Sequence, residues 1–156
     1  MAITLFELAK DMSLAAVPAA GFGMLFNVPP RILGYCAMGG ALGHGTRFIL
    51  VQSLHLPLDR ATFLSATLLS FVGLWAARRV RAHPKAFTVA AVIPMVPGIS
   101  AYTALIAIVQ LGQNGFSDLL LKTAVENGLR TGFSILALAV GLAMPGLLFY
   151  RKRPIV

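Results

Sequence analysis

One apolar segment of this chain, residues 86–111, is interrupted in its middle by the sequence Pro94-Met95-Val96-Pro97-Gly98. Proline removes a backbone donor and clashes with the preceding helical turn, and glycine permits conformations that other residues avoid. A helix that breaks inside a bilayer frees backbone polar groups, which then need protein or water as partners. The segment therefore predicts a broken helix at membrane depth, an arrangement that transporters use at their binding sites.

The composition supports a membrane protein. Of the 156 residues, 58% are hydrophobic and only 12% are charged, whereas a soluble domain is about a quarter charged. Five apolar segments have roughly the 20 residues that a spanning helix needs. We predict an all-α polytopic membrane protein, one integral membrane domain over residues 1–156, whose fourth helix is broken. The expected spans are residues 12–28, 32–54, 61–77, 86–111 and 124–150.

Basic residues gather at the ends of these segments rather than on one face, which is typical of topology signals and argues against nucleic-acid binding. Eight of the 13 Lys and Arg residues fall on one expected side of the membrane and three on the other. The larger set comprises Arg31, Arg78, Arg79, Arg81, Lys85, Arg151, Lys152 and Arg153. The positive-inside rule then predicts a cytoplasmic C-terminus and a periplasmic N-terminus.

Small residues four positions apart recur in these segments, and such pairs let helix backbones approach closely in a membrane. The pairs are Ala19/Gly23, Gly39/Gly43, Ala41/Gly45, Gly128/Gly132 and Ala137/Gly141. They predict a tight helix bundle with a surface left over for a partner.

Arg47 and His44 lie three residues apart in the second segment and so share one helix face. An arginine at mid-bilayer is costly and usually marks a pathway or a buried pair. Its planar guanidinium can hold a carboxylate by two hydrogen bonds, and a neighbouring histidine can adjust the charge near neutral pH. We predict that the two residues bind substrate. The alternative is that Arg47 reaches a lipid headgroup or pairs with a partner chain.

The break itself is a second candidate site. A helix that restarts near Gly98 directs free N–H groups at an anion, and Ser100 and Tyr102 add hydroxyl donors close by. Pro94, Pro97 and Gly98 are then expected to form a hinge and a cavity wall. The alternative is a kinked helix that serves only packing.

Glu126 and Arg130 are spaced for a helical ion pair, which is expected to be structural rather than a coupling site. Enzyme signatures are missing from the sequence. The five acidic residues are scattered, the three histidines lack metal-ligand spacing, and no glycine-rich phosphate loop occurs. We therefore expect neither an enzyme nor a bound cofactor or metal.

The stretch from His83 to Pro94, continued by Pro97-Gly98-Ile99-Ser100-Ala101-Tyr102, closely resembles the threonine/serine exporter family. Further similarity lies in Gly43-His44-Gly45-x-Arg47 and in the C-terminal Pro145-Gly146-Leu147. More narrowly, the chain is similar to the small subunit of the split, two-protein type implicated in succinate export. The resemblance implies a larger membrane subunit as obligate partner, a bacterial inner-membrane location and a small carboxylate as substrate.

The residues and the resemblance together predict a subunit of a secondary exporter of small carboxylates such as succinate, with membrane lipid as its surroundings. One alternative cargo is threonine or serine, whose ammonium group needs an anionic partner. Glu126 is the acidic residue inside an expected span that could supply it. Another alternative is a scaffold subunit that stabilises the larger partner without touching substrate.

Overall fold

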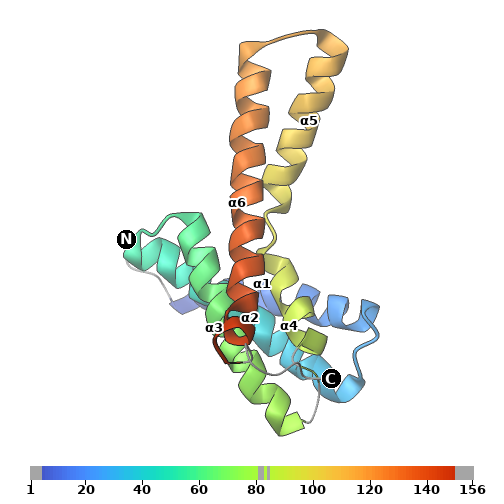
Figure 1. Ribbon diagram of the computed structural model, residues 1–156, viewed down its shortest axis with the longest axis vertical. Coiled ribbons are helices and arrows are strands. Elements are labelled where there is room, and N and C mark those ends of the chain that lie inside the picture. Colours follow the sequence, from blue (N-terminus) through green and yellow to red (C-terminus); the bar gives the residue numbers. More distant parts are fainter. Residues whose placement is uncertain (1–4, 81–82, 84, 150–156) are drawn as a thin grey trace.

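The computed structural model describes residues 5–80, 83 and 85–149, and the secondary structure of these residues is entirely helical (Figure 1). The all-α prediction is confirmed, and each predicted segment matches one helix or, for the fourth, a broken set of helices. The elements are α1 (Leu5–Leu25), α2 (Pro30–Leu54), α3 (Leu58–Val80), α4 (Lys85–Val92), the 3-10 helix η1 (Ile93–Met95), α5 (Gly98–Asn114) and α6 (Asp118–Phe149).

The fourth segment is broken where the sequence predicts it. Helix α4 passes into η1, Val96 is extended with φ −64° and ψ 131°, and Pro97 caps α5. The arms on either side of the break, residues 87–95 and 98–114, are bent by 59° relative to each other. The two prolines supply this break because neither can donate the backbone hydrogen bond that a continuous helix requires.

Five membrane crossings are not confirmed. Among the described residues, α3 and α6 are long and apolar enough to cross a bilayer, and the bent pair formed by α4–η1 and α5 counts as a third crossing if it is one span. Helix α1 begins with the charged residues Glu7, Lys10 and Asp11, and α2 is rich in glycine and carries His44 and Arg47. These residues lower the mean hydropathy of α1 and α2 below that expected of a spanning helix. Figure 1 also shows α1 and α2 running across the direction of α6.

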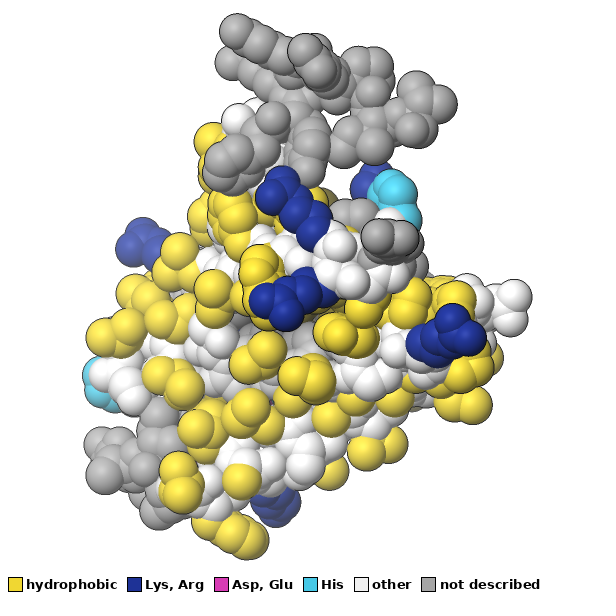
Figure 2. Space-filling view, turned by 90° about the horizontal axis from the view of Figure 1, so that it is seen from below, with side chains coloured by type: hydrophobic (Ala, Val, Ile, Leu, Met, Phe, Trp, Pro, Cys, Tyr) yellow, Lys and Arg dark blue, Asp and Glu magenta, His cyan; other side chains and the backbone are white. Residues whose placement is uncertain are grey.

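The charge distribution is visible on the face opposite the tip of the α5–α6 hairpin (Figure 2). There, hydrophobic side chains alternate with several Lys and Arg, and no acidic side chain is visible among those drawn in colour. The described members of the expected basic set are exposed, and they are Arg31, Arg78, Arg79 and Lys85. Arg81, the Arg151–Arg153 cluster and the end of the last expected span at residue 150 lie outside the described residues.

The small-residue pairs mostly serve helix packing. A Cβ added at Gly40 would lie 2.4 Å from the Cβ of Ala19, and one added at Gly141 would lie 2.8 Å from that of Ala66. These contacts join α1 to α2 and α3 to α6. By contrast, an added Cβ at Gly128 or Gly132 would meet nothing within 4 Å. The Gly128/Gly132 pair therefore packs against no other element in the described part of the chain.

Candidate functional site

Helix α2 presents two rows of residues four apart, each of which ends in a polar side chain. One row is Gly39, Gly43 and Arg47; the other is Gly40 and His44. Residues four apart lie one above the other on a helix face. Because the glycines carry no side chain, neighbouring segments lie close to α2, and the polar residues at the row ends come within reach of them.

The first row faces the broken segment. A Cβ added at Gly39 would lie 2.8 Å from the Cβ of Ala91 in α4, and one added at Gly43 would lie 3.1 Å from Met95 Sδ in η1. Met95 is fully buried. One turn further along α2, a guanidinium nitrogen of Arg47 (Nη1) donates a hydrogen bond of 2.7 Å to the Met95 carbonyl. The guanidinium therefore binds a backbone carbonyl at the helix break.

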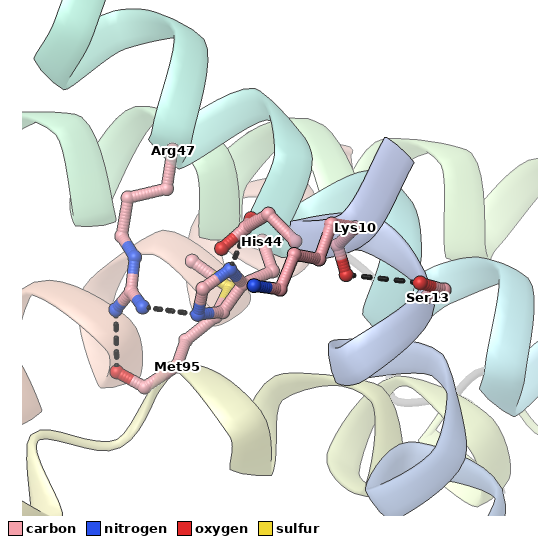
Figure 3. A network of polar contacts seen from close by, with 6 residues as sticks. Lys10, Ser13, His44, Arg47 and Met95 are labelled. Atoms are coloured by element: carbon pink, nitrogen blue, oxygen red, sulfur yellow. Dashed lines mark hydrogen bonds and ion pairs between the residues drawn. The ribbon is translucent and has the colours of Figure 1, made fainter. Parts of the chain in front are cut away.

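The second row faces α1. A Cβ added at Gly40 would also lie 3.0 Å from the Ala15 carbonyl oxygen. Next in this row, His44 Nδ1 lies 2.6 Å from Asp11 Oδ2, although the two residues are 33 positions apart in the sequence. The other ring nitrogen, Nε2, lies 2.7 Å from the second amine of Arg47. Figure 3 shows the polar contacts around His44 and Arg47.

Asp11, His44, Arg47 and the Met95 carbonyl thus form one continuous chain of polar contacts, which we call the polar relay. It joins α1, α2 and the broken segment. The side chains of Asp11 and His44 are each 22% exposed. Partial burial strengthens such contacts relative to water, and access from outside is retained.

The donors and acceptors of the relay fix the state of His44. A guanidinium has donors only, so Nε2 accepts the hydrogen bond from Arg47 and carries no proton. The proton of a neutral imidazole then sits on Nδ1, which donates to the Asp11 carboxylate. The relay therefore holds one positive charge, one negative charge and a neutral histidine.

The residues predicted at the break are not joined to the relay. The Gly98 amide donates to the Val96 carbonyl at 2.8 Å, so this N–H is not free for an anion as the sequence predicts. Tyr102 is 67% exposed, and Ser100 is partly buried. The hydrogen bonds described for Arg47 go to His44 and Met95, not to either hydroxyl. Roles for Ser100 and Tyr102, and a hinge at Pro94, Pro97 and Gly98, stay predictions.

The expected ion pair of Glu126 with Arg130 is not formed in the described part of the chain. Glu126 instead lies 3.7 Å from Lys122, one turn earlier on α6, and both side chains are largely exposed. Each neighbour is one turn away, so side-chain rotamers rather than spacing decide between them. An exposed pair of this kind contributes little to stability.

Asp11 is the member of the relay that sequence reasoning missed. Asp11 precedes the first expected span, so the sequence suggests only a charged residue at the start of that span. Its position directly before an apolar run, in a chain with only five acidic residues, is the one feature that could have marked it as functional. The role of the Met95 carbonyl could not be found from side chains, because the acceptor is backbone that the break exposes.

Hollows also lie elsewhere in the described part of the chain. An open groove of about 530 Å³ runs between α3 and α6, with Phe63, Phe133 and Val140 among its lining residues and Asp59 at one edge. A small cavity of about 40 Å³ lies between α2 and α3. No cluster of three metal-ligating side chains occurs in the ranges that the structure covers. The relay is therefore the strongest candidate site.

The sequence of this chain matches a known protein family. The sequence profile described as "Threonine/Serine exporter, ThrE" matches residues 11–148. The chain belongs to the threonine/serine exporter family. This family is one of exporters rather than enzymes, and the matched region includes the whole relay and the break.

A relative from Haemophilus influenzae, described as an uncharacterized protein, is 49% identical over 156 residues. The alignment covers 99% of this chain and 52% of the relative, so the chain spans about half the length of the curated relative it matches. No solved structure matches the chain.

Proposed function

We propose that this chain is the membrane subunit of a two-component secondary exporter of small carboxylates, with succinate as the expected cargo. The proposal includes a location in the bacterial inner membrane as a multi-pass protein of five crossings, with its N-terminus in the periplasm and its C-terminus in the cytoplasm. The observation that carries the proposal is the hydrogen bond of 2.7 Å from Arg47 to the Met95 carbonyl at the helix break.

Arg47 suits this role by chemistry and by position. Its fork of donors matches a carboxylate, and in this structure the two amines are occupied by His44 Nε2 and the Met95 carbonyl. A substrate carboxylate would replace these two neutral acceptors with one anionic group that accepts both hydrogen bonds, which makes a bidentate charged pair. Substrate binding would thereby release the broken segment from α2.

The partner proposal rests on length and on surface. The chain corresponds to about half of its Haemophilus relative, and the α5–α6 hairpin exposes large apolar side chains such as Ile99, Leu119 and Phe133. A larger membrane subunit that supplies the other half would complete the exporter. Lipid covers the remaining apolar surface.

The test is carboxylate efflux per assembled complex, in cells that express both subunits. Arg47→Ala is expected to reduce succinate efflux by a factor of about ten or more, because one hydrogen-bonded charge is worth about 1.5–3 kcal/mol. Arg31→Ala is the matched control, since Arg31 is an exposed arginine of the same helix. Normal efflux by Arg47→Ala at normal complex abundance would contradict the proposal and favour a scaffold role.

Threonine or serine is the second candidate cargo, and two observations favour it. One is the description of the family. The other is Asp11, which lies in the same relay as Arg47 and offers an anionic partner for an ammonium group. Glu126, the residue expected for this role, pairs instead with Lys122 on α6.

The two cargos are separated by a pair of variants. If the cargo is an amino acid, Asp11→Asn abolishes threonine efflux and Glu126→Gln leaves it unchanged. If the cargo is succinate alone, wild-type complexes move succinate and no labelled threonine. Loss of threonine efflux in Glu126→Gln, with retention in Asp11→Asn, would restore the assignment expected from the sequence.

A further inference from the structure

We infer that His44 binds the proton that accompanies the carboxylate, so that substrate and proton cross the membrane in the same direction. This inference rests on the proposed function and adds the coupling ion to it. It is carried by the order of donors and acceptors along the polar relay, from Asp11 through His44 to Arg47.

The first step is that a proton on His44 and the present position of Arg47 exclude each other. Arg47 donates to Nε2 at 2.7 Å, and Nδ1 already carries a proton directed at Asp11. A second proton can enter only at Nε2. Two N–H groups would then face each other at hydrogen-bonding distance, and two positive charges would adjoin. Protonation of His44 therefore displaces the Arg47 guanidinium.

The second step is that a carboxylate and a proton assist each other. A carboxylate that draws Arg47 away from His44 leaves Nε2 free to accept a proton. A proton that arrives first frees Arg47 to bind a carboxylate. Linkage makes this effect reciprocal, because each ligand changes the affinity for the other by the same factor. The Met95 carbonyl accepts from the other guanidinium nitrogen of Arg47 and is the second acceptor that a substrate carboxylate would replace.

The third step concerns charge. The relay is neutral when empty, since Asp11 balances Arg47. With His44 protonated it carries one net positive charge, which suits an anionic substrate. Asp11 keeps its place beside Nδ1 and becomes the counter-ion of the imidazolium. The bound proton is therefore stabilised from one side while the other side is open to substrate.

Other titratable groups lie on the helices packed against α2. On α1 these are Glu7 and Lys10 near Asp11, and on α2 itself Cys36 lies two turns before His44. The charged residues of α3 lie in its first and last turns and are Asp59, Arg60, Arg78 and Arg79. Helix α4 contributes Lys85 at its start, and η1 has none. The His44 ring itself contacts Asp11 and Arg47.

The experiment uses the complex of both subunits in liposomes that contain a pH-sensitive dye, with the membrane potential clamped. Labelled succinate is added outside, and labelled threonine is the second arm. Wild-type complexes should acidify the lumen as label enters, with about one proton per substrate near neutral pH. In His44→Gln the ratio of protons to label should fall close to zero. His55→Asn is the matched control, because His55 is an exposed histidine with φ 50°, which asparagine tolerates.

Asp11→Asn gives a second readout that does not depend on the folding of His44→Gln. Loss of the counter-ion disfavours the protonated histidine, so the ratio of protons to labelled succinate should fall below that of the wild type. An unchanged proton ratio in His44→Gln or in Asp11→Asn, or protons that move against the substrate, would each overturn the inference. Absence of labelled flux in the wild type would instead overturn the proposed function beneath it.

Discussion

Two parts of this chain pack in opposite ways. In the compact part, formed by α1, α2, α3, α4 and η1, four glycines lie so close to neighbouring elements that an added Cβ would clash: Gly39, Gly40 and Gly45 of α2 and Gly73 of α3. In the α5–α6 hairpin, which projects from the compact part in Figure 1, Gly112, Gly128 and Gly132 adjoin open space. Close approach of backbones in the compact part brings side chains from separate elements together, and the polar relay lies there.

The hairpin has the opposite character. Helix α6 is 32 residues long, packs on α3 and on α5, and leaves Leu119, Leu129 and Leu136 more than half exposed. A surface of this kind needs lipid or another chain to cover it. The comparison teaches that the compact part carries the chemistry of the chain, whereas the hairpin offers surface. The following variants test that division.

The largest expected effect is on packing in the compact part. Gly40→Val should lower the free energy of unfolding by about 3 kcal/mol, because its side chain must displace Ala19 and the Ala15 backbone. Gly128→Val in the hairpin is the matched control and should change it by less than about 0.5 kcal/mol. Unfolding of the purified chain in detergent micelles measures both. Equal losses would remove the contrast between the two parts.

The next effect is on transport. Arg47→Lys keeps the positive charge but removes the planar guanidinium. In the wild type, two nitrogens of this group donate hydrogen bonds to His44 Nε2 and to the Met95 carbonyl at the same time. We expect efflux of succinate per assembled complex to fall about tenfold, which corresponds to about 1.4 kcal/mol. Full activity of this variant would show that a point charge suffices and that the geometry of the relay is irrelevant.

A smaller effect is expected where the hairpin is anchored. Ser134 of α6 is buried and donates a hydrogen bond of 2.9 Å to Asp59 of α3. Ser134→Ala should lower the free energy of unfolding by about 1–2 kcal/mol, because it leaves a partly buried carboxylate without this donor. Thr123→Ala is the control, since that hydroxyl bonds only a carbonyl of its own helix. Equal effects of the two changes would refute the anchoring role.

The smallest effect is expected on the projecting surface. The Glu126 side chain is 65% exposed beside Lys122, so Glu126→Gln should change stability by less than about 0.5 kcal/mol. Unfolding in micelles measures this as well. A loss above about 1 kcal/mol would mean that the hairpin depends on the pair.

The sequence predicts much of this architecture for identifiable reasons. The helices follow from apolar runs bounded by Pro29, Pro57 and similar breaks, and the interruption at Pro94 to Gly98 follows from backbone chemistry alone. The pairing of Arg47 with His44 follows from their three-residue spacing. The number of membrane crossings was harder to predict. Helices α1 and α2 are long enough to cross a bilayer, but their polar and small residues lower their hydropathy below that of a typical spanning helix.

The contacts between distant segments could not be predicted. Asp11 reaches His44 only because Gly40 and Ala19 let α1 lie directly on α2, and that depends on which faces meet. The Met95 carbonyl is backbone, so no residue type marks it as an acceptor. The choice of Lys122 over Arg130 as partner of Glu126 is a rotamer choice that spacing leaves open.

The most direct test of the account is the protonation state of the His44 ring, read from its ¹⁵N chemical shifts by solid-state NMR of the complex in lipid near neutral pH. The relay predicts a neutral ring with the proton on Nδ1 and an unprotonated Nε2 that accepts from Arg47. In Arg47→Ala this preference should weaken. A proton on Nε2 in the unliganded wild type, whether in the other neutral tautomer or in an imidazolium, would contradict the account.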